Sequence, residues 1–380
     1  MTVAELLFWS STALIAYAYV GYPMALAFIR LVHKKVVNKA DITPSVTFII
    51  TAYNEERRIG EKLNNTLKLD YPAALLEVIV ASDCSSDRTD QLVRSYGDRS
   101  IKLVRADLRK GKEAAQKLAV GVAKGEILVF SDVATILQPD AIRNIVKSFN
   151  DPSVGCVSSA DRFVDQDGRT SGEGAYVKYE MFLRSLESTV YSLVGLSGSF
   201  FAARSSVCRQ SWSEDLQSDF NTLLSSVRLG LRGVADPESV GYYHNLLDQR
   251  KEYERKVRTV VRGISVFMRS VSLLNPLRYH VFAWQLFSHK LCRWLVPFAM
   301  IAALVANGWL ALSSPVYGVI LLVQGGFYSL ALVYMLSRRV PSVGMLRIPS
   351  FFVMANLSIL DAWMRYFRGE RIVSWTPSKR

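Results

Sequence analysis

Two long stretches of this chain contain no charged residue, and they restrict its possible folds more than any other feature of the sequence. The first covers residues 6–29, and the second covers residues 295–336, with a Ser-Ser-Pro break at 313–315. A helix needs about 20 apolar residues to cross the hydrocarbon core of a bilayer. We therefore predict an N-terminal transmembrane helix within residues 1–32 and a transmembrane helical hairpin over residues 295–336.

The charges that flank the first stretch predict its orientation. Only Glu5 precedes it, whereas four basic residues follow it closely: Arg30, Lys34, Lys35 and Lys39. Basic residues favour the cytoplasmic side of a membrane, so we expect the following domain in the cytoplasm. A signal peptide is the alternative. No basic segment precedes the stretch and no small-residue cleavage site follows it, which favours a retained anchor.

Three further segments are predicted in the C-terminal part of the chain. Residues 249–294 contain basic amphipathic patterns, which are typical of helices that lie in a membrane interface. Residues 348–367, apolar as far as Met364 except for Asp361, are expected to form a third C-terminal membrane or interfacial segment. Residues 368–380 are predicted to be a basic cytoplasmic tail.

Between these segments, residues 44–248 are predicted to form an α/β domain. Short apolar runs, among them ILVF at 127–130 and the run at 154–159, alternate with helical patterns. This alternation is typical of right-handed βαβ units around a parallel sheet. Neither GxGxxG nor GxxxxGK[ST] occurs at a strand-to-helix turn, which argues against a dinucleotide-binding dehydrogenase and a P-loop ATPase.

Four acidic side chains stand where strands end or helices begin in this domain: Glu55, Asp83, Asp132 and Asp219. Ligands of open α/β sheets bind at the carboxyl ends of the strands, which is where Asp132 follows the run ILVFS. A single acid of this kind is most simply a turn or helix-cap residue. Four of them in this order favour a site for a nucleotide and a divalent cation.

The formal net charge of +13 fits nucleic acid, an anionic membrane or a phosphorylated substrate as a partner. The basic residues follow the membrane segments, and no interleaved aromatic platform accompanies them, so nucleic acid is not the expected partner. The four cysteines and four histidines lack metal-ligand spacing, which argues against zinc chemistry.

The motifs of the domain, taken together, resemble those of the family 2 glycosyltransferases of GT-A fold, in their bacterial membrane-bound branch. TAYNEE (51–56) resembles the first strand motif of that family, and ASDCSSDRT (81–89) resembles the second. GKEAAQKLA (111–119) is similar to its Gly-Lys helix start, and SDVAT (131–135) to its DxD region. The acceptor-side strand and the general-base helix have counterparts in GSFFAAR (198–204) and SDFNTLLSSVRLGLRGV (218–234).

The resemblance implies a GT-A, Rossmann-like, mostly parallel sheet with flanking helices, plus transmembrane and interfacial helices at both ends. It implies a nucleotide-sugar donor (UDP- or GDP-sugar) bound by Thr51, Tyr53, Glu55, Asp83 and Lys112. Asp132 would lie at the diphosphate and bind the metal, Mg²⁺ or Mn²⁺. Asp219 would be the catalytic base. Because the leaving diphosphate gains charge, Arg255 and Arg258 are further candidates for contacts with it. The alternative is that this basic helix face contacts anionic lipid headgroups.

Two departures from the family pattern qualify these expectations. The second acid of the DxD region is Ala134, so one expected carboxylate contact to the metal or ribose is missing. The residue before the predicted base is Ser218, where the family usually has an acid. The QxxRW motif of processive synthases is also incomplete, because residues 255–259 and 290–294 both lack its glutamine.

We therefore expect an inverting transferase that moves a sugar to a lipid-linked or polysaccharide acceptor at the cytoplasmic face of a bacterial inner membrane. Membrane lipids, and in some settings polysaccharide assembly proteins, would be its partners. The alternatives are a processive synthase with a degenerate QxxRW and a catalytically silent scaffold that binds nucleotide sugar. Acceptor contacts are expected in loops such as residues 161–174.

Overall fold

The computed structural model describes residues 1–97, 100–164, 175–244, 249–336 and 347–371. It divides into two compact units, and each is described here by itself. The sheet unit comprises Leu26–Leu247 and Ser265–Ala283, and the helical unit comprises Met1–Ala25, Asp248–Ile264 and Trp284–Arg371. The predicted soluble domain therefore corresponds to the first and longest segment of the sheet unit.

The described strands form one eight-stranded sheet in the order β3-β2-β1-β4-β7-β6-β8-β5. Their bounds are β1 Val46–Ala52, β2 Leu76–Ser82, β3 Ile101–Arg105, β4 Ile127–Asp132, β5 Ile136–Leu137, β6 Val154–Val164, β7 Phe200–Arg204 and β8 Arg232–His244. Strands β3, β2, β1 and β4 are parallel neighbours, and β6 and β8 are also parallel. β7 runs antiparallel between β4 and β6, and β5 runs antiparallel to β8. The predicted GT-A-like, mostly parallel sheet is confirmed.

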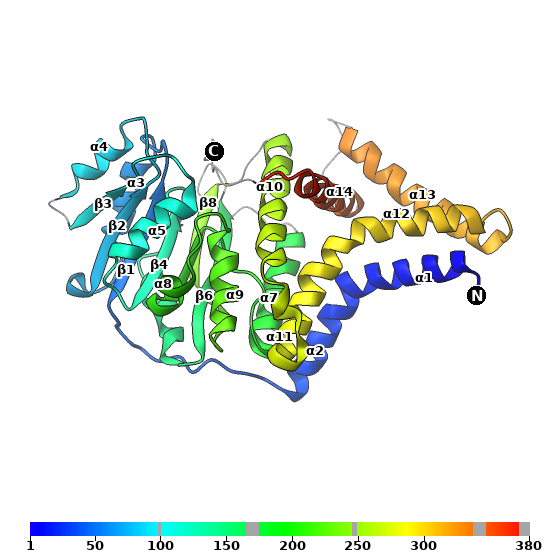
Figure 1. The fold of residues 1–380 in the computed structure, drawn as a ribbon, viewed down its shortest axis with the longest axis horizontal. Helices are drawn as coiled ribbons and strands as arrows, with labels where there is room; N and C mark the ends of the chain where they lie inside the picture. The colour runs from blue at the N-terminus through cyan, green and yellow to red at the C-terminus, as the bar shows by residue number, and fades with distance from the viewer. Residues whose placement is uncertain (98–99, 165–174, 245–248, 337–346, 372–380) are drawn as a thin grey trace. The chain divides into compact units, whose positions relative to one another are not determined.

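Helices cover both faces of the parallel part (Figure 1). The helices of the sheet unit up to β6 are α3 Ile59–Thr66, α4 Thr89–Arg94, α5 Lys112–Val122 and α6 Ala141–Lys147. β1 is buried along its whole length, so both of its faces need a cover. On one face, Phe48 and Ile50 pack in a core with Ile59 and Leu63 of α3. On the other face, Gln116 of α5 donates a hydrogen bond to Thr51.

The antiparallel part carries α7 Ala175–Val190, α8 Ser205–Ser211 and α9 Ser218–Arg228. α9 lies very close to β6 and β8, and glycines make that approach possible. A Cβ atom on Gly233 would come within 2.2 Å of Leu223 Cδ1, and one on Gly155 within 2.8 Å of Ser226. The sheet thus fixes α9, and with it Asp219 in its first turn.

Strand β8 was not predicted, because Pro237 interrupts its apolar pattern and proline normally weakens a strand assignment. The structure accommodates the proline at an irregularity. β6 pairs Ser158 with Ala235 and then Ala160 with Val240, so the intervening residues of β8 lie outside the regular ladder. The strand therefore tolerates a residue that normally argues against a strand.

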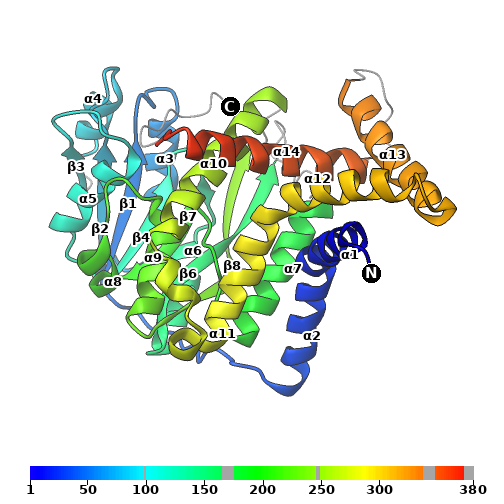
Figure 2. The same cartoon turned by 45° about the vertical axis from the view of Figure 1, so that its right-hand side comes forward.

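Further helices precede and follow the α/β domain in the sequence, and Figures 1 and 2 label them. They are α1 Val3–Ala16, α2 Tyr22–Val32, α10 Gln249–Met268, α11 Pro276–Leu286, α12 Arg293–Leu310, α13 Pro315–Leu336 and α14 Arg347–Phe367. Within the helical unit, Phe8 of α1 packs against Ala303, Ala306 and Leu310 of α12.

Among the described residues, three helices are long and apolar enough to cross a membrane: Val3–Val32, Pro276–Leu310 and Pro315–Met335. These helices indicate membrane association. The predicted boundary between residues 249–294 and 295–336 falls inside the second of them. α14 matches the predicted segment 348–367 and is not among the three. Of the predicted tail, residues 372–380 lie outside the described part of the chain.

Candidate active site

Three of the predicted site residues, Thr51, Asp83 and Asp132, lie at the carboxyl ends of β1, β2 and β4. Thr51 of β1 is paired with Ala81 of β2 on one side and with Asp132 of β4 on the other. Asp83 follows β2 directly, and its backbone N–H donates to Ala52 O. The parallel register therefore brings three residues that are far apart in sequence to one edge of the sheet.

Asp83 is fully buried and holds the loop before α5. Its Oδ1 accepts hydrogen bonds from the backbone N–H groups of Lys110 and Gly111, and its Oδ2 accepts from Gly111, all at 3.0 Å. Gly111 has φ +107°, a conformation that disfavours side chains, and α5 begins at the next residue. Asp83 thus sets where Lys112 enters the site.

Thr51 and Tyr53 line the same edge and are both held by neighbours. The hydroxyl of Thr51 accepts a hydrogen bond from Gln116 Nε2 at 3.0 Å. The guanidinium of Arg109 lies 3.9 Å from the centre of the Tyr53 ring, a cation–π contact. A planar cation stacked on an aromatic ring presents a surface on which a nucleobase can stack.

Glu55 is engaged with another protein group. It is 3 % exposed, and Arg58 donates to it from Nε and Nη2, both at 2.8 Å. Burial raises the pKa of the Glu55 carboxyl, the arginine opposes that shift, and the charges of Asp132 and Asp87 add to it. Glu55 therefore anchors the loop after β1 through this bidentate pair.

Lys112 joins two parts of the site. Its Nζ lies 2.5 Å from Asp132 Oδ1 and donates to the carbonyl oxygen of Gly198 at 2.9 Å. The Lys112 side chain is only 9 % exposed, whereas that of Asp132 is 23 % exposed. One ammonium group thus neutralises Asp132 and holds the turn at residues 195–199.

Asp219 lies against the same turn. A Cβ atom on Gly198 would come within 3.0 Å of Asp219 Oδ2, so only glycine leaves room for the carboxylate there. Gln217 donates to Asp219 Oδ2 at 3.1 Å. The backbone N–H of Ser218 donates to Glu113 Oε1 at 3.4 Å, which ties the start of α9 to α5. Lys112, Asp132, Gly198 and Asp219 are therefore one continuous group.

Arg255 and Arg258 belong to α10 in the helical unit. Arg255 Nη2 forms an ion pair with Glu252 at 3.2 Å. Burial lowers the pKa of Arg258, and the neighbouring charges of Arg262 and Arg255 lower it further. Their predicted contact with a leaving group stays a prediction, as they and Asp219 lie in different units.

Lys62 is a site residue that the sequence analysis did not identify. It is completely buried behind the SDVAT segment, and its Nζ donates to Ser131 Oγ at 2.8 Å and to Thr135 O at 2.5 Å. The sequence carries one signal for it: Lys62 shares the apolar face of α3 with Ile59 and Leu63. A lysine on a buried helix face needs a polar partner in the core.

The family model for Glycosyl transferase family 2 matches residues 47–214. The similarity to family 2 glycosyltransferases therefore covers this segment of the chain. The matched domain contains the ends of β1, β2 and β4 and stops just before α9, so it includes Asp132 and excludes Asp219.

Two curated relatives and one solved structure are similar to this chain. The succinoglycan biosynthesis protein ExoO of Rhizobium meliloti is 29% identical over 132 residues, which are 34% of this chain and 37% of that protein. The beta-monoglucosyldiacylglycerol synthase of Synechocystis is 26% identical over 185 residues, 46% of this chain and 38% of that protein. The chain thus spans little more than a third of the length of these two relatives.

The solved structure is the mannosyltransferase PcManGT from Pyrobaculum calidifontis in complex with GDP-Man and Mn²⁺. It superposes with a TM-score of 0.76 at 23% identity, over 96% of this chain and 99% of that one. The similarity shows a shared fold over almost the whole of both chains.

The donor set around Asp132 suits a metal that is shared with a substrate. Among the residues that the structure describes, no three His, Cys, Asp or Glu side chains gather as a metal site. Mg²⁺ is commonly bound by one or two carboxylates together with substrate phosphates. Asp132, the most exposed of the strand-end acids, can supply that single carboxylate.

Lys62 predicts a pH dependence of stability. Burial lowers its pKa to about 7 from 10.5, and the charge of Asp132 opposes that shift. Between these two values the unfolded chain carries a proton that the folded chain lacks, so unfolding becomes less favourable as the pH rises from about 7 towards 10.5. When Lys62 is neutral, its amine still has two N–H groups, which can donate to Ser131 Oγ and Thr135 O.

We expect the melting temperature of the wild type to rise relative to that of Lys62→Met between pH 7 and pH 9. Thermal unfolding of both proteins in lipid nanodiscs measures this difference. Lys68→Met, which removes an exposed lysine six residues away, should keep the wild-type pH dependence. If the melting temperatures of the wild type and Lys62→Met changed with pH in parallel, the lowered pKa assigned to Lys62 would be contradicted.

Proposed function

We propose that the protein is an inverting glycosyltransferase that moves a sugar from a nucleotide-sugar donor to a hydroxyl of a lipid-linked or glycan acceptor. The observation that carries this proposal is the continuous group of Lys112, Asp132, Gly198 and Asp219. In this proposal, Lys112 and Asp132 interact with the diphosphate, and the neighbouring Asp219 interacts with the acceptor.

Asp219 is the proposed base. As the acceptor oxygen bonds to the anomeric carbon, its proton passes to the Asp219 carboxylate, and the bond from that carbon to the diphosphate oxygen breaks on the opposite face. The electron pair of the broken bond stays on the diphosphate. Because the acceptor attacks from the face opposite the leaving group, the configuration of the anomeric carbon is inverted. Gln217 and the turn at Gly198 hold the carboxylate in place for this step.

The departing diphosphate gains negative charge, and Lys112 is the proposed cation that stabilises it. Lys112 already lies between two oxygens of the site, so it needs little reorganisation. A divalent cation, held by Asp132 and the diphosphate, would add Lewis-acid stabilisation of the same charge. Mn²⁺ is present in the PcManGT complex, which supports this cofactor.

The nucleoside is the proposed ligand of Thr51, Tyr53, Glu55 and Asp83. A carboxylate has about four lone-pair positions, and three hydrogen bonds from Lys110 and Gly111 already reach Asp83. One position is left for a donor group of the base. In this proposal Tyr53 and Arg109 supply the stacking surface, and Glu55 positions the loop.

The proposed location of the protein is a bacterial inner membrane, with the catalytic domain on the cytoplasmic side. The three long apolar helices and the basic residues after the first of them support this location. One similar protein is a glycolipid synthase by name and another takes part in succinoglycan biosynthesis, which supports a lipid-linked or glycan acceptor.

Asp219→Asn tests the proposed base. The amide cannot accept the acceptor proton, so we expect transfer to fall by at least about 100-fold while donor affinity changes less than about twofold. A panel of UDP- and GDP-sugars with membrane lipid extract provides the assay. Asp215→Asn, which changes an acid on the nearby surface, is the matched control. Full activity of Asp219→Asn would show that Asp219 is not the catalytic base.

Removal of divalent cations tests the cofactor. We expect EDTA to reduce transfer by at least about tenfold, and Mg²⁺ or Mn²⁺ to restore it, because Asp132 is the one acid of the DxD region that remains beside Ala134. Turnover that is equal with and without EDTA would show that Lys112 alone neutralises the leaving group.

A further inference from the structure

The turn at residues 195–199 contacts three residues of the proposed reaction: Lys112, Asp132 and Asp219. Gly198 O accepts a hydrogen bond from Lys112, and Gly198 also lies against the Asp219 carboxylate. Ser199 O accepts from the backbone N–H of Asp132 at 3.0 Å. A displacement of this turn would therefore change the surroundings of the proposed base, cation and metal ligand together.

Residues 195–199 belong to neither a helix nor a strand, so their backbone groups need other partners. Ser197, which is 2 % exposed, provides several of them. Its Oγ accepts from the backbone N–H groups of Ser199 and Phe200, both at 3.4 Å. Its own N–H donates to Ser158 Oγ of β6 at 2.8 Å. One buried side chain thus holds the turn together and connects it to the sheet.

The hydroxyl of Ser197 has a single proton, and Asp161 determines where this proton points. Ser197 Oγ donates to Asp161 Oδ1 at 2.6 Å, a length typical of a charge-assisted hydrogen bond. The contact of Ser197 Oγ with Ser199 Oγ is longer, at 3.3 Å, so the carboxylate is the better acceptor. A hydroxyl that donates its proton in this way keeps two lone pairs for the N–H groups of the turn.

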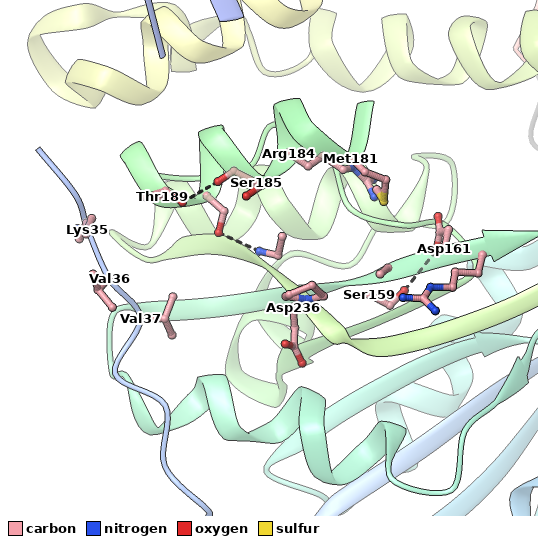
Figure 3. Close-up of a pocket in the computed structure, with 15 residues that line it drawn as sticks. Lys35, Val36, Val37, Ser159, Asp161, Met181, Arg184, Ser185, Thr189 and Asp236 are labelled. Carbon is pink, nitrogen blue, oxygen red and sulfur yellow. Dashed lines mark hydrogen bonds between the residues drawn. The ribbon is translucent and has the colours of Figure 1, made fainter. Parts of the chain in front are cut away.

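Asp161 is itself held by the sheet. It belongs to β6 and is paired with Gly241 of β8. Ser159 Oγ donates to Phe200 O at 2.6 Å and lies 3.3 Å from Asp161 Oδ1. Figure 3 shows Asp161 and Ser159 beside a pocket of about 450 Å³ between α7 and strands β6 and β8. Because Asp161 lines this pocket, a smaller side chain there enlarges an existing space and leaves no new closed cavity.

Tyr243 belongs to the same cluster. Burial raises the pKa of its hydroxyl, and the charge of Asp161 raises it further, whereas interactions with Ser199 and Ser197 oppose that shift. The tyrosine is therefore neutral beside the carboxylate. The other end of the turn has its own support, because Arg184 Nη2 donates to Gly195 O at 3.4 Å. Loss of Asp161 would thus release the end of the turn that is next to Gly198.

We propose that Asp161 is a positioning residue for the transfer step; this role rests on the proposed function. Asp161 acts through Ser197. The carboxylate orients the Ser197 hydroxyl, the hydroxyl holds the backbone of the turn, and the turn holds Gly198 against Lys112 and Asp219.

The expected signature of this role is a fall in kcat with little change in donor affinity. Lys112 keeps its contact with Asp132 when the turn is displaced, so the diphosphate keeps its proposed cation. Asp219 borders the turn at Gly198, so a displaced turn changes the placement of the carboxylate that is to accept the proton. A small misplacement of a reacting group lowers the rate of the chemical step.

A double-mutant cycle between Asp161 and Ser197 tests the proposal. Wild type, Asp161→Ala, Ser197→Ala and the double variant are compared in nanodiscs, with the nucleotide-sugar panel and membrane lipid extract. We expect kcat to fall at least about tenfold in each single variant, and donor affinity to stay within about threefold. The double variant should be no slower than the slower single variant, because both substitutions remove the same hydrogen bond.

Two further variants separate positioning from a general loss of structure. Asp161→Asn keeps an oxygen that can accept from Ser197, so it should recover most of the kcat that Asp161→Ala loses. Asp236→Asn is the matched control, because Asp236 also lines the pocket but its carboxylate accepts from Lys39 and Ser239. It should keep the kcat of the wild type. Thermal unfolding shows whether each variant is folded.

The outcomes separate this role from the proposed function. Wild type that binds no nucleotide sugar and transfers none would contradict the function itself. Wild type that transfers, with Asp161→Ala within about twofold of its kcat, would overturn the positioning role alone. Losses that multiply in the double variant, or a fall in donor affinity as large as the fall in kcat, would also overturn it. If Asp161→Ala does not fold, Asp161→Asn takes its place in the cycle and must have no effect when Ser197 is alanine.

Discussion

The contact of Lys112 with Asp132 and Gly198 is the interaction on which the rest of the site depends. β4 is the last strand of the parallel part, and β7, which begins after the turn at residues 195–199, is its antiparallel neighbour. The ammonium lies 2.5 Å from Asp132 at the end of β4 and 2.9 Å from Gly198 O in that turn. Because Lys112 is largely buried, leaving its charge without these partners would be costly.

Burial also decides which acids are available for substrate. Glu55 and Asp83 are 3 % and 0 % exposed, and both are engaged with groups of the protein, Arg58 and the loop before α5. The Asp132 side chain is 23 % exposed, and Asp219 lies against a glycine that leaves space beside it. Asp132 is therefore the acid with the most exposed side chain, whereas Asp219, which is 7 % exposed, borders the space that Gly198 leaves without a side chain.

The sequence predicted the parallel strands well, because continuous apolar runs that end in polar residues are typical of strands buried on both faces. Because parallel strands end at one edge, the positions of Asp83 and Asp132 at the same edge also follow from the strand pattern. It did not predict β8, whose proline lies at an irregular part of the ladder, or the role of Lys62, which depends on what α3 packs against. The contact of Gly198 with Asp219 arises from packing between distant segments, which no local pattern records.

The central claim is that the site depends on Lys112 and that its ammonium group binds the diphosphate. Nucleotide binding and sugar transfer by Lys112→Met test this claim most directly. Charge-assisted hydrogen bonds contribute about 1.5–3 kcal/mol, so we predict at least about tenfold weaker affinity for the nucleoside diphosphate that the wild type binds, and a larger loss of transfer. Lys117→Met, on the exposed side of the same helix, should behave as the wild type. A folded Lys112→Met protein with unchanged affinity and turnover would contradict the account.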